Sequence, residues 1–121
     1  MDISKTIQQL KAEPGFTDNV GMVLVHNGVV RGWSRADRQK VDSIKIEPDT
    51  AKMETIRREL EGRPGIFRIV AHANSGLMKP GDDVLFLIVA GDIRENVKAA
   101  FAELLDRIKA EAVFKQEVLA E

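Results

Sequence analysis

The chain has 121 residues, a length typical of a single domain built around one hydrophobic core. Apolar residues make up 44% and charged residues 31% of the sequence, a balance that argues against intrinsic disorder. The formal net charge is -1, so no overall positive field favours nucleic acid or an anionic membrane as a partner. The sequence has no cysteine, which excludes disulfides, thiolate zinc sites and a cysteine nucleophile.

The distribution of apolar residues gives no indication of a targeting or membrane-spanning segment. The N-terminal stretch carries polar residues every few positions rather than the apolar core of a signal peptide. The longest apolar run, Val84 to Ala90, is too short to span a bilayer. We find no repeat, low-complexity tract or linker, and therefore expect residues 1–121 to form one domain of a cytoplasmic protein.

The first part of the chain predicts a helix followed by a strand. Apolar residues recur at helical spacing until Pro14-Gly15 ends the pattern, which predicts a short amphipathic helix built on Ile3, Ile7 and Leu10. Residues 20–30 are largely aliphatic and predict β structure, in which Asn27-Gly28 taken alone is typical of a hairpin turn.

A polar loop and a strand–helix pair come next. Residues 32–40 are charged, have no period and predict a mobile loop with an exposed Trp33. Ile44 and Ile46 alternate with polar residues as a short strand. A helix is predicted after Pro48-Asp49 and before Gly62 and Pro64-Gly65, on the spacing of Met53, Ile56 and Leu60.

The second half predicts an α+β domain rather than regular βαβ units. Residues 66–72 read as a strand, residues 79–82 as a turn, and residues 84–90 as a strand buried on both faces and therefore central in its sheet. Asp92 and Glu95 have the spacing of a capping box and predict the start of the longest helix. Residues 113–119 could add a final strand.

Basic residues near the ends of predicted elements are candidates for an anion site. Arg94 lies in the first turn of the long helix, where free backbone N–H groups favour an anion, although a surface pair with Glu95 is the simpler interpretation. Lys109 and Lys115 are ordinary C-terminal helix cations unless burial lowers the pKa of Lys115, which would give it acid/base or nucleophilic competence. Arg31 suits bidentate phosphate or carboxylate recognition, or simple solvation at a strand end.

The sequence lacks the common motifs of metal-binding, nucleotide-binding and serine-hydrolase sites. His26 and His72 are far apart and are accompanied by no H-E-x-x-H spacing, so we expect no metal site and take each as a structural histidine. The sequence has no P-loop, no G-x-G-x-x-G opening a helix and no G-x-S-x-G elbow. Nucleotide hydrolysis, dinucleotide binding and serine-hydrolase chemistry therefore find no support, and we expect no bound cofactor.

Several segments in a fixed order carry a resemblance to a known family. They are Gly28-Val29-Val30-Arg31, Ile69-Val70-Ala71-His72, Pro80-Gly81-Asp82-Asp83-Val84, Arg94 at the start of the long helix, and Lys109 with Phe114-Lys115 at its end. In this order they resemble MoaE proteins, the large catalytic subunits of molybdopterin synthase. The resemblance extends from about residue 21 to residue 117. It also implies that Gly28 lies in one continuous strand, so a bulge replaces the hairpin.

The resemblance implies a fold, a reaction and partners. The fold would be α+β, with a mixed or antiparallel sheet packed with helices and a hammerhead-like subdomain. The reaction would belong to molybdenum cofactor biosynthesis: sulfur passes from the C-terminal thiocarboxylate of a small ubiquitin-like, MoaD-like carrier subunit to cyclic pyranopterin monophosphate. The chain would form a homodimer within a heterotetramer with that carrier.

Carried over residue by residue, the resemblance implies a set of site residues. Lys115 would be the leading acid/base or covalent residue, and Lys109 would hold the carrier tail or the intermediate. Arg31, Arg94 and His72 would bind the substrate. Lysine and arginine suit these roles because one can be activated by desolvation and the other binds anions through a planar fork.

Two departures from the family pattern keep other functions open. Ile93 stands where members usually place a histidine, and the segment from Lys109 to Lys115 is slightly shorter than usual, which on a strand could turn Lys115 to the opposite face. The alternative is a non-catalytic MoaE-like paralogue that dimerises and binds a sulfur-carrier protein. A third possibility is a generic anion-binding or oligomerisation domain, which dispersal of the four cations rather than their convergence would favour.

Overall fold

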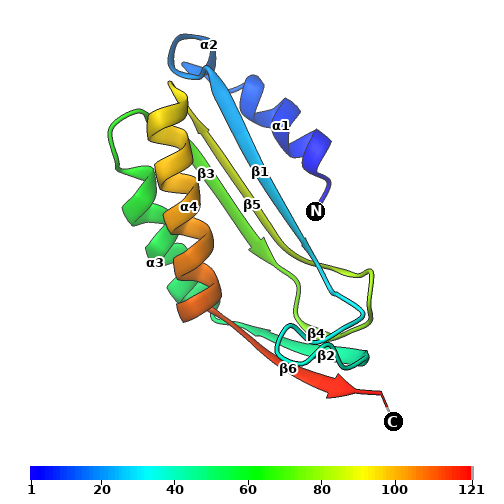
Figure 1. The fold of residues 1–121 in the computed structure, drawn as a ribbon. Helices are drawn as coiled ribbons and strands as arrows, with labels where there is room; N and C mark the ends of the chain where they lie inside the picture. The colour runs from blue at the N-terminus through cyan, green and yellow to red at the C-terminus, as the bar shows by residue number, and fades with distance from the viewer. Residues whose placement is uncertain (121) are drawn as a thin grey trace.

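The computed structural model describes residues 1–120 and contains two antiparallel three-stranded sheets (Figure 1). The large sheet has the strand order β1-β5-β3, formed by β1 (Met22–Val29), β3 (Ile66–Ala73) and β5 (Asp83–Gly91). The small sheet has the order β4-β2-β6, formed by β2 (Val41–Pro48), β4 (Gly76–Met78) and β6 (Val113–Leu119). Every strand pair is antiparallel. The predicted α+β class with antiparallel pairing is confirmed.

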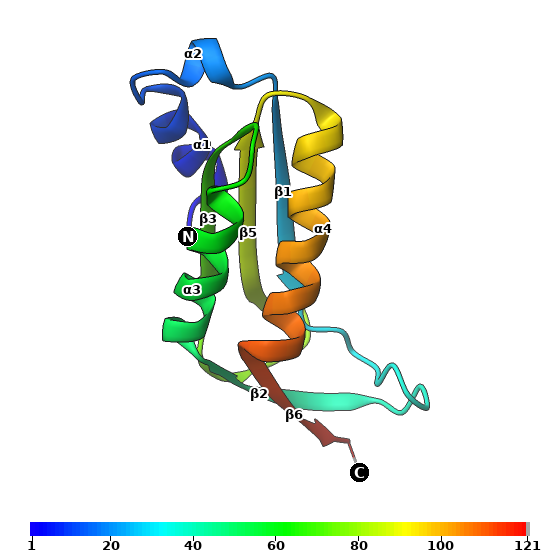
Figure 2. The ribbon, with the colours of Figure 1, turned by 90° about the vertical axis from the view of Figure 1, so that its left-hand side faces the viewer.

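Helices cover both faces of the large sheet. Figures 1 and 2 show α3 (Thr50–Glu61) and α4 (Arg94–Glu111) side by side on one face and α1 (Ile3–Lys11) on the other, with the short α2 (Phe16–Asn19) leading into β1. The main core lies between helices α3 and α4 and the large sheet. It includes Met53, Ile56, Leu60, Leu85, Leu87, Val89, Val97, Leu104 and Ile108. Among residues 1–120, no helix combines the length and the apolar character needed to cross a membrane.

The central position of β5 follows from its composition. Its residues from Leu85 to Ala90 are almost completely buried, and it pairs with β1 on one side and β3 on the other. A strand without polar alternation must have both faces covered, as the sequence predicts. The other predicted strands are confirmed as well, including the final one, whereas α2 and β4 were not expected from the sequence.

Strand β1 runs without a hairpin through Asn27 and Gly28. Gly28 pairs with Leu85, but the next residue, Val29, pairs with Asp83, so the register shifts between them. This confirms the predicted bulge in a continuous strand and contradicts a hairpin at this point. Beyond the bulge the chain leaves the sheet and enters the loop of residues 32–40.

The predicted capping box at the start of α4 is wrong. The helix begins at Arg94, with Ile93 as an N-cap residue whose side chain makes no capping hydrogen bond. The backbone N–H of Asp92 donates to the carbonyl oxygen of Gly65 at 2.9 Å, so it is not free to bind the carboxylate of Glu95. The carboxylate of Asp92 instead accepts hydrogen bonds from the backbone N–H of Ile93 and the side chain of Asn96. Pairing at the end of β5 therefore takes precedence over local capping.

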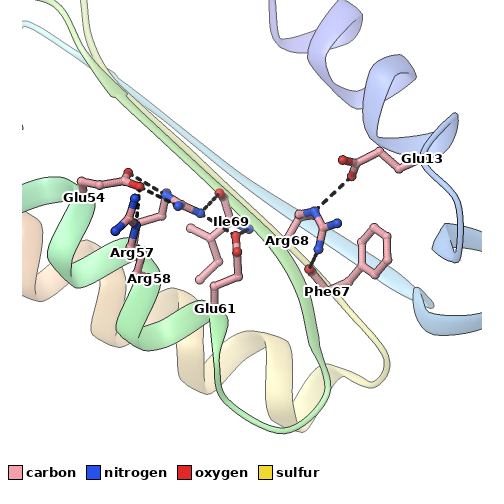
Figure 3. A network of polar contacts seen from close by, with 8 residues as sticks. All are labelled: Glu13, Glu54, Arg57, Arg58, Glu61, Phe67, Arg68 and Ile69. Carbon is pink, nitrogen blue, oxygen red and sulfur yellow. Dashed lines mark hydrogen bonds and ion pairs between the residues drawn. The ribbon is translucent and has the colours of Figure 1, made fainter.

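Strand β3 forms one edge of the large sheet, and side chains of α3 cover its backbone (Figure 3). The carboxylate of Glu61 accepts hydrogen bonds from the backbone N–H of Ile69 at 2.8 Å and from Arg57 at 2.7 Å. Arg57 also donates to the carbonyl oxygen of Ile69 at 3.4 Å. Both backbone groups that Ile69 presents at the edge are thus occupied, which discourages pairing with another strand.

The small sheet has its own apolar cluster, made of Val30, Val41, Ile44, Ile46 and Met78. Val84 and Val113 pack against this cluster and also against the main core. Val113 follows α4 directly, so the end of that helix fixes where the small sheet lies relative to the large one. This second unit corresponds to the subdomain that the family resemblance implies.

A candidate anion-binding site between the two sheets

A pocket of about 620 Å³ lies where the two sheets meet. Its walls come from the end of β1, the loop that follows it, the inner face of β2, the first residues of β5, the C-terminal end of α4 and β6. The polar residues that line it are His26, Asn27, Arg31, Arg35, Lys109, Lys115 and Glu117. Four of these side chains carry positive charge and one carries negative charge, so the pocket is suited to an anion.

Strand pairing decides which face of β6 meets the pocket. Lys115 pairs with Ile46, and Glu117 pairs with Ile44, whose side chains belong to the small core. Because alternate residues of a strand share a face, Lys115 lies on the pocket side and Phe114 on the outer side, where 54% of it is exposed. The shortened segment therefore leaves Lys115 facing the pocket. Phe114, the neighbour of Lys115 in sequence, is not a wall of the pocket.

The surroundings of Lys109 in the pocket disfavour the positive charge of its ammonium group. It keeps solvent contact, but partial burial lowers the pKa of its ammonium group, and the charges of Lys115, Arg31 and Arg35 lower it further. The sequence left such desolvation open for Lys115, whereas the structure shows it at Lys109. The reason is geometric, since Lys109 leaves the last turns of α4 toward the pocket while Lys115 is exposed on β6.

The loop after β1 brings an aromatic ring and further cations to the pocket. The guanidinium carbon of Arg31 lies 4.8 Å from the centre of the Trp33 ring, and that of Arg38 lies 4.2 Å from it. These cation–π contacts hold Arg31 and the loop in position. The hydroxyl of buried Ser34 donates to the carboxylate of Glu117 at 3.3 Å, which ties the loop to β6.

Arg94 does not reach this pocket in the same chain. It begins α4, whereas Lys109 lies in the last turn, and a helix of 18 residues is roughly 27 Å long. The side chain of Arg94 is 78% exposed and lies 3.6 Å from the carboxylate of Glu95, the simple surface pair that the sequence also allowed. Ile93 is exposed beside it. Of the four predicted cations, the structure brings Arg31, Lys109 and Lys115 together and leaves Arg94 apart.

His72 also lies away from the pocket. It is an exposed residue of β3, the edge strand opposite β1. Its Nε2 lies 3.1 Å from the side-chain oxygen of Asn74, and its ring packs on Phe86. Among residues 1–120, no group of three or more His, Asp or Glu side chains is arranged to hold a metal ion.

Sequence reasoning missed several pocket residues. His26, Trp33, Arg35 and Glu117 all line the pocket, yet they come from a strand, a loop and a second strand that only tertiary pairing brings together. The dense charge of residues 32–40 was the one local signal, and it predicted only a loop. His26 was taken as a structural histidine, but its Nε2 is buried and has no hydrogen-bond partner within the described residues.

The fold and this cationic pocket define an α+β protein with a candidate anion site at the junction of two sheets. A family model described as "MoaE protein" matches residues 1–111. The chain therefore belongs to the MoaE family.

Known proteins similar to this chain agree with that assignment. A protein of Haloferax volcanii described as a probable molybdopterin synthase is 28% identical over 116 residues, which cover 92% of this chain. The match covers 44% of that relative, so this chain spans less than half of its length.

Solved structures share the fold at lower identity. The MoaE protein from Burkholderia ambifaria superposes with a TM-score of 0.75 at 21% identity, covering 99% of this chain and 81% of that one. A complex of subunits 1 and 2 of molybdopterin-converting factor from Helicobacter pylori gives a TM-score of 0.69 at 15% identity, with 98% and 80% covered.

Proposed function

We propose that this chain is the catalytic large subunit of a molybdopterin synthase and transfers sulfur from a thiocarboxylated carrier subunit to cyclic pyranopterin monophosphate. The observation that carries the proposal is the meeting of Arg31, Lys109 and Lys115 in one pocket. The reaction brings together two anions, a phosphate ester and a thiocarboxylate, and a pocket with four cations and one carboxylate offsets their mutual repulsion. The resemblance of the chain to a probable molybdopterin synthase supports the same activity.

Each pocket cation has a chemical role in this proposal. Arg31 binds the phosphate through its planar fork, and its contact with Trp33 limits the entropy lost on binding. Lys109, whose pKa is lowered, releases a proton more readily than an ordinary lysine and can exchange one with the substrate or hold the carrier tail. Lys115 reaches the same pocket from β6 and is the leading acid/base or covalent residue.

The partner in this proposal is a small ubiquitin-like carrier whose C-terminal tail enters the pocket. The Helicobacter pylori neighbour is a complex of two subunits of molybdopterin-converting factor, which supports a two-subunit arrangement for this chain as well. The tail ends in an anionic thiocarboxylate, so the cations that bind the phosphate also attract the carrier.

A reconstituted reaction tests the proposed activity. The protein is mixed with a thiocarboxylated carrier subunit and cyclic pyranopterin monophosphate, and molybdopterin is measured as its fluorescent oxidation product. We expect product above a control with carrier alone, and we expect Lys115→Ala to abolish it while the melting temperature stays nearly unchanged, because Lys115 is exposed and contributes little to the core.

Lys45 provides the matched control for this assay. It lies on β2 opposite Gln116, on the outer face of the small sheet, and pairs with Glu47 at 3.1 Å. Lys45→Ala should retain activity because this lysine does not line the pocket. A Lys115→Ala protein as active as the wild type would contradict the catalytic assignment of Lys115.

The alternative function is that of a non-catalytic paralogue that binds a carrier protein. The observation that favours it is the exposed Ile93 beside an Arg94 that lies far from the pocket of its own chain. Tight binding of the carrier without any product in the reconstituted assay would decide for this alternative.

A homodimer would resolve the position of Arg94. Because the two ends of α4 are far apart, Arg94 can contact the substrate only in the pocket of a second copy, and a homodimer within a heterotetramer supplies one. Mixing inactive Lys115→Ala protein with inactive Arg94→Ala protein should then restore part of the activity, since a mixed dimer contains one intact site. Two inactive variants that stay inactive when mixed and re-equilibrated would contradict a shared site.

A further inference from the structure

His26 occupies a position that the proposed reaction has not yet used. It lies on β1 two residues after Leu24, which packs against the main core, so the two side chains share the helix-covered face of the sheet. The pocket begins beside the C-terminal end of α4, and the imidazole of His26 forms part of its wall. His26 thus places a polar ring at the pocket on a face of β1 that is otherwise apolar.

Gly28 fixes where that ring lies. A Cβ atom added at Gly28 would lie only 2.9 Å from Nε2 of His26, so the imidazole extends along the strand over the glycine. Any larger residue at this position would displace the ring. Nε2 is buried in this arrangement and has no hydrogen-bond partner within the described residues. Buried polar atoms are nearly always hydrogen-bonded, and those that are not often serve a ligand.

The charges around His26 keep its ring neutral. Burial lowers the pKa of the imidazole, and the neighbouring ammonium group of Lys109 lowers it further. The other charged groups that line the pocket are Arg31, Arg35, Lys115 and Glu117. A neutral imidazole has one N–H donor and one nitrogen acceptor, so it suits an uncharged polar group rather than an anion.

We propose that His26 is a substrate-binding residue whose Nε2 forms a hydrogen bond with an uncharged ring group of the substrate, next to the anionic group that the pocket cations hold. This inference rests on the proposed function, in which cyclic pyranopterin monophosphate joins a polar ring system to a phosphate. The cations bind the phosphate, and His26 binds the ring. The pocket thereby distinguishes its substrate from other phosphate compounds, which the cations alone would accept.

Trp33 gives a direct binding assay, because it is the only tryptophan of the chain and lines the pocket. Its fluorescence is titrated with two probes, inorganic phosphate and cyclic pyranopterin monophosphate, in the wild type and in two variants. His26→Phe keeps a planar ring but removes both nitrogens. His26→Gln restores a polar atom near the position of Nε2.

We expect His26→Phe to weaken binding of cyclic pyranopterin monophosphate by roughly 5- to 10-fold, the usual effect of one hydrogen bond, and to leave phosphate binding within about 2-fold. His26→Gln should recover most of the loss. Unchanged phosphate binding also shows that each variant is folded with an intact pocket.

Other outcomes separate the two proposals. If the wild type binds cyclic pyranopterin monophosphate more tightly than phosphate and His26→Phe keeps that whole preference, the role of His26 is wrong and the proposed function stands. Equal weakening of both probes would also overturn the role, since it would show that His26 only shapes the pocket. If the wild type shows no preference for the pterin over phosphate, the proposed substrate is wrong and the role of His26 is wrong with it.

Discussion

Lys109 illustrates how a single residue can work against the fold that contains it. Its ammonium group is partly buried beside three other cations, whose effect Asp106 partly counteracts. A base whose pKa is lowered on folding binds protons less well in the native state than in the unfolded chain. Protonation of Lys109 therefore favours unfolding, and this cost is full below the native pKa and disappears as the pH rises to 10.5, the ordinary pKa of lysine. Such strained placement is typical of functional groups rather than structural ones.

Replacing Lys109 should consequently stabilise the protein. We expect Lys109→Gln to raise the free energy of unfolding at about pH 7 by less than about 1 kcal/mol, since solvent screens part of the repulsion. The gain should shrink as the pH rises toward 10.5, the ordinary pKa of lysine, because the wild-type lysine then loses its charge. Urea unfolding at a series of pH values measures it, with the exposed α4 residue Lys98→Gln as control. Equal stability of Lys109→Gln and wild type at neutral pH would contradict the pocket electrostatics.

His26 should make the stability of the protein depend on pH in the acidic range. Its pKa is lowered from 6.5, so the unfolded chain binds the proton better, and stability is lost as the pH falls from 6.5 toward the native pKa. We expect the free energy of unfolding to decline as the pH falls below 6.5, and His26→Phe to remove part of that decline. Carboxylates contribute only at lower pH; the pKa of Glu54, for example, is lowered to about 2 by its hydrogen bond with Arg57. A decline of the same size in His26→Phe would show that other groups cause it.

At the scale of elements, helix α3 both fills the core and protects a sheet edge. Met53, Ile56 and Leu60 are buried, while Arg57 and Glu61 bind the backbone of Ile69 on β3 (Figure 3). One side of the helix therefore packs into the core, and the adjacent side forms hydrogen bonds with the strand backbone. An edge covered in this way is not available for pairing with a strand of another chain.

Removing the carboxylate of Glu61 should expose that edge. We expect Glu61→Ala to lower the free energy of unfolding by about 1–2 kcal/mol, because it leaves the N–H of Ile69 without a partner. Glu59→Ala is the matched control, since Glu59 on the same helix forms only a surface ion pair with Arg107 and should cost less than about 1 kcal/mol. Thermal unfolding of both variants measures the difference. Equal losses in the two variants would contradict a special role for the edge contacts.

The sequence predicted these elements well wherever a hydrophobic period or an uninterrupted apolar run was present. The helix with Met53, Ile56 and Leu60 and the central strand of residues 84–90 are two examples. Helix α2 and strand β4 are too short to show a period, and they exist because their neighbours position them. The capping box failed for a related reason, since the N–H of Asp92 bonds to Gly65, a residue distant in sequence.

Prediction of the site was limited in the same way. Resemblance in sequence order found Arg31, Lys109 and Lys115, and strand pairing brings them into one pocket. No local pattern could show that His26 joins them, because its neighbours there lie on α4 and β6. The assigned roles of Lys115, Arg94 and His72 stay predictions until the variants are measured.

At the scale of the whole molecule, two apolar clusters of unequal size share a narrow junction. The main core contains most of the fully buried residues, whereas the second cluster, around the small sheet, has five buried residues and is linked to the main core through Val84 and Val113. The pocket lies at this junction, and we expect its walls to belong to parts of the molecule with different local stability.

Hydrogen exchange should reveal that difference. We expect the backbone amides of β5 to exchange most slowly and those of β2 and β6 to exchange faster through local opening of the small sheet. A ligand that bridges the pocket should slow exchange in β6, because it stabilises the closed form. Equal protection of the two sheets in the free protein would show that the molecule opens only as one unit.

Strand β6 is also the last wall of the pocket to be synthesised. Its partner β2 is synthesised long before it, and Ile44 and Ile46 must wait for β6 before their side of the small sheet is complete. A nascent chain that ends within α4 lacks Lys115 and Glu117 and therefore lacks part of the pocket wall. If the proposed function holds, the growing protein has no complete site for substrate and carrier until β6 has been made and has paired with β2.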